Sequence, residues 1–74
     1  MRVRVKCFAT LSHHTPPDGV LELDDRATVA AMLPRLGLSP EDIKLVFINS
    51  KNSELETVLA EGDQVGLFPA VGGG

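Results

Sequence analysis

The stretch TVAAMLPRLG, residues 28–37, decides how this chain can fold, because it predicts the main helix. Its apolar residues recur at the spacing i, i+3, i+4 and i+7, which forms one stripe for packing against a sheet. Thr28 is the predicted N-cap, and Gly37 is the residue that ends the helix. Because Pro34 removes one backbone N–H and crowds a preceding carbonyl, we expect a helix that is short or bends there. The stripe consists of Val29, Met32, Leu33 and Leu36.

The residues before this helix predict a hairpin of two strands. RVRVKC at residues 2–7 and VLELD at residues 20–24 both alternate, so that one face of each strand is apolar. The turn-forming residues 12–19 connect the two strands. Outward basic side chains of the first strand could then pair with Glu22 and Asp24 of the second. The inward residues are Val3, Val5, Cys7, Leu21 and Leu23.

The residues after the helix predict one further helical turn and a third strand. SPED at residues 39–42 has a serine cap, a proline at the first helical position and two acids, which favours a short helical turn. KLVFIN at residues 44–49 is apolar with little alternation, as expected for a strand in the middle of a sheet. Residues 49–53 are polar and turn-like, and residues 55–59 fit either a short strand or a single turn.

QVGLF at residues 64–68 predicts the last strand after a turn at residues 61–63, and Pro69 fits only its end or a sheet edge. The element order is therefore strand, strand, helix, strand, short element, strand. One mixed sheet packed on one main helix buries every apolar stripe in a single core, which predicts an α+β, β-grasp (ubiquitin-like) fold. We expect residues 1–69 to form this domain and residues 70–74 to form a flexible tail.

Length and composition exclude several functional classes. A chain of 74 residues has one core but cannot also enclose a large pocket lined with its own catalytic groups, so an autonomous enzyme is disfavoured. No run reaches the ~18–20 apolar residues of a membrane helix, so we expect no membrane partner. With 7 basic and 10 acidic residues, no Trp and no Tyr, we also expect no nucleic-acid partner. A single cysteine excludes a disulfide framework and fits a reducing cytoplasm.

Three groups of side chains invite a catalytic or metal-binding interpretation, and each has a plainer one. Cys7 alternates with inward valines, so we expect a core residue and not a reactive thiol. His13 and His14 lack a matching set of carboxylates or thiolates, so we expect no metal site. Ser12, His13 and Asp18 are too loosely spaced in a loop to predict a catalytic triad.

The sequence ends in PAVGGG, residues 69–74, and this segment has two interpretations. A glycine run at a terminus is often no more than a frayed end. Alternatively, glycines without a β-carbon let a terminal carboxylate pass through a narrow channel, and residues 70–74 can extend roughly 17 Å into the deep site of a partner. A small domain then needs no active site of its own.

Residues 59–74, LAEGDQVGLFPAVGGG, resemble the ubiquitin-like sulfur carriers of the MoaD/ThiS family. The family shows a leucine, a Gly-Asp turn, an apolar strand and a terminal Gly-Gly at these places, and the length and element order agree over the whole chain. Residues 8–9 (FA), residues 27–29 (ATV) and residues 68–71 (FPAV) are closer to the small subunit of molybdopterin synthase than to the thiamine branch. Two departures are Ala70, where a second proline is common, and Gly72, a third glycine.

The resemblance implies a mechanism at the terminus. An E1-like adenylyltransferase would use ATP and magnesium to convert the carboxylate of Gly74, which follows Gly73, into an acyl-adenylate. A sulfur donor such as a cysteine desulfurase or rhodanese would then replace AMP, leaving a thiocarboxylate. The acceptor would be the molybdopterin synthase large subunit or, in the thiamine branch, thiazole synthase. The chain itself would bind no cofactor and would act as a protein co-substrate.

The apolar stem before the glycines is the predicted partner-binding segment. The resemblance implies that Phe68, Pro69, Val71 and Gly72 anchor the tail in a partner groove, where aromatic anchors dominate the binding energy. In the alternative interpretation, Phe68 caps the sheet's own core. The leading hypothesis is a sulfur carrier for molybdopterin synthesis, with a carrier for thiazole synthesis or a ubiquitin-like interaction module without sulfur chemistry as alternatives.

Overall fold

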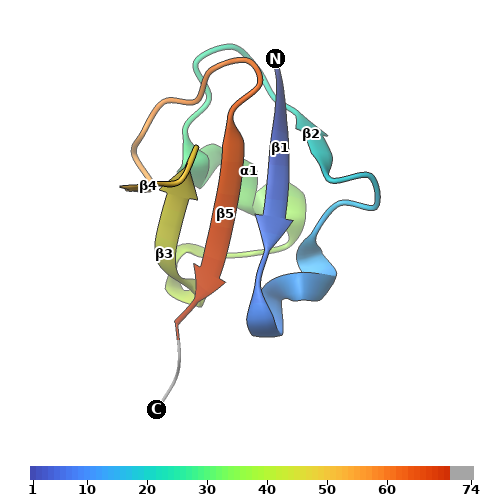
Figure 1. Cartoon of the computed structure of the whole chain (residues 1–74), viewed down its shortest axis with the longest axis vertical. Helices are drawn as coiled ribbons and strands as arrows, with labels where there is room; N and C mark the ends of the chain where they lie inside the picture. Colours follow the sequence, from blue (N-terminus) through green and yellow to red (C-terminus); the bar gives the residue numbers. More distant parts are fainter. Residues whose placement is uncertain (71–74) are drawn as a thin grey trace.

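β1 (Arg2–Cys7) and β5 (Gln64–Pro69), near the two ends of the sequence, lie side by side in the middle of a five-stranded sheet (Figure 1). The computed structural model describes residues 1–70. The strand order is β2-β1-β5-β3-β4, with β2 at Val20–Glu22, β3 at Ile43–Ile48 and β4 at Lys51–Ser53. β1 and β5 run parallel and the other pairs antiparallel, so the sheet is mixed. The single α-helix of the described residues, α1 (Val29–Leu36), lies across one face (Figure 1). This is the predicted α+β, β-grasp architecture.

β1 forms because its alternation matches a sheet with one covered face. Val3, Val5 and Cys7 are at most 3% exposed, and the residues between them face solvent. β2 pairs with β1 in the register Arg2 opposite Glu22, and these two side chains form an ion pair at 3.3 Å. Asp24, which was predicted to pair with a basic side chain of the first strand, lies beyond the end of β2 at Glu22.

α1 begins and ends where its capping residues predict. The Thr28 hydroxyl accepts a hydrogen bond from the Ala31 N–H at 3.2 Å, and Gly37 adopts a left-handed conformation with φ 78°. Pro34 lies inside the helix with its side chain exposed, and the helix ends two residues later. The helix is therefore short, as predicted, and its one apolar stripe packs on the sheet.

The core between α1 and the sheet is aliphatic. The buried residues come from β1, β3, β5, α1 and the connecting loops, and all are aliphatic, Met or Cys. No phenylalanine of the described residues belongs to this core, although Phe is usually among the more buried residues. The largest fully buried side chains are Met32, Leu33, Leu67, Val3 and Val29.

Two local predictions differ from the structure. The loop after β1 contains a 3-10 helix, η1 (Ala9–His14), because Leu11 is drawn into the core. The turn predicted at residues 49–53 is confined to Asn49 and Ser50, both with positive φ, and β4 follows as a short edge strand. For residues 55–59, where a short strand and a single turn were both open, the structure has a turn and one isolated bridge between Val58 and Thr28.

β3 also differs from the prediction of a strand without alternation. Val46 and Ile48 are buried toward α1, whereas Leu45 is 39% exposed and Phe47 is half-buried on the opposite face. The strand is apolar on both faces although only one face is covered, because a single helix spans only one side of the sheet. The predicted turn after Ser39 is present as η2 (Pro40–Asp42). Among residues 1–70, no helix is long and apolar enough to cross a membrane.

Truncating the helix stripe tests this core. Leu33→Ala should lower the free energy of unfolding by about 2–5 kcal/mol, because Leu33 is fully buried between α1 and the sheet. Leu45→Ala, at a partly exposed site on the other face, is the control and should cost less than about 1 kcal/mol. Urea denaturation of both variants measures the difference, and equal losses would contradict a core confined to the helix side.

Candidate functional site

The chain leaves the sheet at the end of β5, where backbone contacts with residues 42 and 43 hold it. Ile43 lies opposite Pro69 in the register of β3 and β5, and the N–H of Ala70 donates a hydrogen bond of 3.0 Å to the backbone carbonyl of Asp42. The predicted site residues Val71, Gly72, Gly73 and Gly74 lie outside the described residues, so the structure places the base of the tail and not its tip.

Asp42 is itself held by a reciprocal cap at the start of η2. Its carboxylate accepts hydrogen bonds from the Ser39 backbone N–H at 3.0 Å and from the Ser39 hydroxyl at 3.1 Å. These hydrogen bonds, foremost that from the backbone, hold the pKa of Asp42 below its ordinary value. The anchoring carbonyl therefore belongs to an ordered turn, which fixes where residue 70 leaves the domain.

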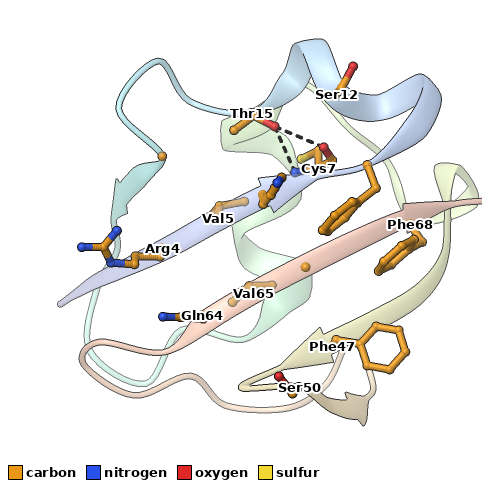
Figure 2. Close-up of a pocket in the computed structure, with 14 residues that line it drawn as sticks. Arg4, Val5, Cys7, Ser12, Thr15, Phe47, Ser50, Gln64, Val65 and Phe68 are labelled. Atoms are coloured by element: carbon orange, nitrogen blue, oxygen red, sulfur yellow. Dashed lines mark hydrogen bonds between the residues drawn. The ribbon is translucent and has the colours of Figure 1, made fainter.

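All three phenylalanines of the chain lie together on the face of the sheet away from α1. The rings of Phe8 and Phe68 are stacked in parallel, with centroids 4.3 Å apart and planes 2° apart. Phe47 meets Phe68 edge to face at 5.5 Å. Figure 2 shows Phe47 and Phe68 projecting from neighbouring strands on the same side of the sheet. We call Phe8, Phe47 and Phe68 the aromatic cluster.

This placement bears on the two interpretations of Phe68. Phe68 is half-buried and lies on the outer face, whereas its neighbour Leu67 is fully buried against α1. Phe68 therefore lies outside the buried core on the helix side, and its role as a partner anchor stays a prediction. Its contacts are with Phe8 and Phe47, and its ring is part of an accessible surface.

An open groove with a volume of about 850 Å³ runs along the outer face beside the aromatic cluster. Arg4 of β1 and Gln64 of β5 line it (Figure 2), and so does Lys6, another outward residue of β1. The Lys6 ammonium lies 5.3 Å from the Phe8 ring centroid, within the range of a cation–π contact. Within residues 1–70, neither Arg4 nor Lys6 forms an ion pair. The groove is thus aromatic at one end and positively charged along one side.

Cys7 is the core residue that its alternation predicts. It is 2% exposed, and its backbone N–H donates to the Thr15 hydroxyl at 2.9 Å (Figure 2). Burial raises the pKa of the Cys7 thiol above its ordinary value of 9.0, and a hydrogen bond between the Cys7 and Thr15 side chains only partly offsets this. A buried thiol that resists ionisation is a poor nucleophile.

The other discounted side chains serve the packing of the loops. His14 Nδ1 lies 2.8 Å from the carbonyl oxygen of Leu36 and so joins η1 to the end of α1. The Asp18 carboxylate accepts from the Val20 N–H at 3.2 Å, which is a local turn contact. Among residues 1–70 there is no group of three or more His, Cys, Asp or Glu side chains that could hold a metal ion.

Similarity to a known family covers both the domain and the tail. The model of the ThiS family matches residues 5–74, nearly the whole chain. The chain belongs to the ThiS family. It is a member of the ubiquitin-like sulfur carriers (ThiS/MoaD-like), as the resemblance of residues 59–74 predicts. Members of this kind are carriers and not catalysts themselves, and they imply an E1-like activating enzyme and a synthase large subunit as partners.

Solved structures agree with this ThiS family fold. The chain is 27% identical to SAMP1 from Haloferax volcanii, with a TM-score of 0.71 and 100% of both chains covered. It is 28% identical to the Haloferax volcanii HVO 2177 protein, with a TM-score of 0.72, covering 100% of this chain and 87% of that one. A putative molybdopterin converting factor, subunit 1, from Pyrococcus furiosus shares the fold at 24% identity, with a TM-score of 0.75 and coverage of 96% and 99%. No curated protein matches.

The sequence predicts the binding residues that precede the ThiS family tail but not the other residues of the outer face. It named Phe68 and Pro69, which the structure places at the end of β5, but not Phe8, Phe47 or Gly66. The signal was present in the alternation, because Phe8 continues the outward positions of β1 and Phe47 alternates with buried Val46 and Ile48. Knowing that the helix covers only one face would have placed both rings on the outer surface.

The buried thiol gives a pH-dependent test of the site. The folded-state pKa of Cys7 is raised above 9.0, so the neutral, buried thiol stabilises the folded state fully below pH 9.0. This stabilisation is lost as the pH rises through the folded-state pKa. The urea midpoint should therefore fall more between pH 8 and pH 11 in the wild type than in Cys7→Ala. Iodoacetamide at pH 8 should label the native thiol far more slowly than the urea-unfolded one. Equal labelling rates would show that Cys7 is accessible.

Proposed function

We propose that this ThiS family chain carries sulfur on the carboxyl group of Gly74 for molybdopterin biosynthesis. The observation that carries the proposal is that the family match continues through residue 74. The fold supports it, because β5 delivers the chain to the sheet rim at Ala70 beside an aromatic surface. The glycines have no side chains that would keep a partner's active site from closing around the terminal carbonyl.

The proposed chemistry belongs to the terminus and to the partners. A carboxylate oxygen of Gly74 attacks the α-phosphorus of ATP, held with magnesium by an E1-like adenylyltransferase, and pyrophosphate leaves. The outer sulfur of a persulfide on a cysteine desulfurase or rhodanese then attacks the acyl carbon, and AMP leaves. The acyl disulfide so formed is cleaved by a second thiol, which reduces the S–S bond, keeps the donor's sulfur in a new disulfide and frees the terminal sulfur. The resulting thiocarboxylate is ionised at neutral pH and needs no base from this chain, so its sulfur is a ready nucleophile for the synthase. The free, buried thiol of Cys7 is consistent with a reducing cytoplasm.

The outer face of the sheet is the proposed docking surface for these partners. Phe68 and Pro69 lie one step before the tail and are partly exposed, so a partner that binds them also aligns residue 70 and the rest of the tail. Aromatic residues at the centre of an interface contribute most of its binding energy. Arg4 and Lys6 add positive charge beside the rings and favour a partner surface that carries carboxylates.

The molybdopterin branch is proposed over the thiamine branch on the sequence of residues 68–71. FPAV is closer to the molybdopterin-synthase small subunit, and the partner is then the synthase large subunit instead of thiazole synthase. A second candidate is a protein modifier, in which Gly74 forms an amide with a lysine of a target. The likeness over the whole chain to SAMP1, a small archaeal modifier protein, favours this alternative.

Intact mass spectrometry tests the terminal chemistry. After incubation with the E1-like enzyme, ATP, magnesium and a sulfur donor, the chain should become about 16 Da heavier, since sulfur replaces one oxygen. The control lacking Gly73 and Gly74 should fold and remain unmodified. An unchanged mass in the presence of an active enzyme would overturn the carrier proposal. A product with the summed mass of the chain and a lysine-containing target, less one water, would support the modifier.

Removing the central ring tests the docking surface. Phe68→Ala should weaken binding to the E1-like enzyme by about 10-fold or more, because it deletes a central aromatic anchor. Val58→Ala, an apolar residue that is 56% exposed and lies outside the aromatic cluster, is the matched control and should bind normally. Isothermal titration calorimetry compares the variants, and equal affinities for all three proteins would remove Phe68 from the interface.

A further inference from the structure

Gly66 lies in the interior of β5, where a glycine normally weakens a strand because it packs no side chain and gains entropy on unfolding. Its backbone does not require glycine, since the glycines with positive φ in residues 1–70 are Gly19, Gly37 and Gly62. A glycine of this kind marks a place where another group approaches the strand closely. The question is therefore which group occupies the space above it.

The space is occupied by the aromatic cluster. A β-carbon at residue 66 would lie 3.2 Å from Cε2 of Phe8, 3.9 Å from Cε1 of Phe68 and 4.0 Å from Cβ of Phe47. Only the contact with Phe8 is shorter than ordinary van der Waals separation, so a side chain at residue 66 would push the Phe8 ring and leave the others nearly untouched.

The register of β1 and β5 explains why Phe8 lies there. Cys7 is opposite Leu67, so the next step of the parallel pair sets Phe8 beside Phe68 on the outer face. The Phe8 N–H donates to the Leu67 carbonyl at 3.0 Å and continues the ladder. Adjacent strands lie about 4.8 Å apart, which matches the 4.3 Å between the two ring centroids.

The backbone of Phe8 has little room to adjust if its ring is pushed. On one side it is bound to β5, and on the other Ala9 adopts φ 52° as η1 begins. An added β-carbon at residue 66 would therefore displace the Phe8 ring by a few tenths of an ångström instead of moving the chain. That displacement would disturb the parallel stack on Phe68, whose planes are now 2° apart.

We propose that Gly66 is a positioning residue for partner docking: its missing side chain lets Phe8 hold the Phe68 ring in the orientation that the partner contacts. This inference rests on the proposed function, because it takes the outer face as the docking surface for the E1-like enzyme. It explains why a strand-weakening residue stands in the middle strand of the sheet. Gly66 makes β5 less stable, but it leaves room for the ordered stack of Phe8 on Phe68.

Gly66→Ala tests the proposal because it should keep or raise the thermal stability while it weakens docking to the E1-like enzyme. Alanine favours the strand, so the thermal midpoint should stay equal or rise. The KM for the carrier in ATP–pyrophosphate exchange catalysed by the E1-like enzyme should rise about 3- to 10-fold, in line with the loss of one aromatic pair, with kcat unchanged. A purely structural role for Gly66 would instead lower stability or leave both quantities unchanged.

A double-mutant cycle identifies the ring through which Gly66 acts. In the Phe8→Leu background the pushed ring is absent, so adding Gly66→Ala should leave the KM within about 2-fold of that background. Gln64→Ala, two residues earlier on the same face of β5, is the matched control and should not show this dependence on Phe8. If Gly66→Ala raises the KM equally in both backgrounds, the action through Phe8 is overturned.

Measurements on the free carrier separate this inference from the proposed function. Ring-proton chemical shifts of Phe8 and Phe68 should change in Gly66→Ala, because each ring lies in the ring current of the other. Unchanged shifts, or an unchanged KM with an active wild type, would overturn the positioning role. A wild type that supports no pyrophosphate exchange with active enzyme would overturn the proposed function, while the ring shifts still report whether Gly66 sets the stack.

Discussion

The structure depends on one constraint: a single eight-residue helix has to bury one face of a five-stranded sheet. α1 carries one apolar stripe, and that stripe meets the inward residues of β1, β3 and β5 to form an aliphatic core. Nothing in residues 1–70 covers the other face of the central strands (Figure 1). The three phenylalanine rings lie on that uncovered face, where they stay outside the aliphatic core and form the aromatic cluster.

The parallel pairing of β1 with β5 links this surface to the tail. Residues 8 and 68 are 60 positions apart in sequence, yet the register sets them one strand spacing apart. The same strand, β5, then leads to Ala70, whose N–H donates a hydrogen bond to the carbonyl of Asp42 in η2. The aromatic cluster and the point where residue 70 leaves the sheet thus share one strand, so under the proposed function a partner that bound the rings would also meet the chain at that point.

Most of the fold follows from local patterns in the sequence. Alternation in residues 2–7 predicts β1, the Thr28 and Gly37 caps bound α1 correctly, and Pro69 ends β5 as its missing N–H requires. η1 and β4 were missed because each is set by tertiary packing: Leu11 is drawn into the core, and Lys51–Ser53 pair with β3 only after a tight turn at two residues with positive φ. Alternation alone places Phe8 and Phe47 on the outer face, but their contacts with Phe68 require the registers of β1 and β3 against β5, which local patterns do not contain.

The hydrogen bond from Ala70 to Asp42 has a consequence for how β5 ends. The family that residues 59–74 resemble commonly has a second proline at this position, and proline has no N–H to donate. Such a proline would fix the backbone φ angle of residue 70 through its own ring. Here the N–H of Ala70 is retained, so the position of residue 70 is set by a contact with the carbonyl of Asp42 and not by the covalent geometry of the residue itself.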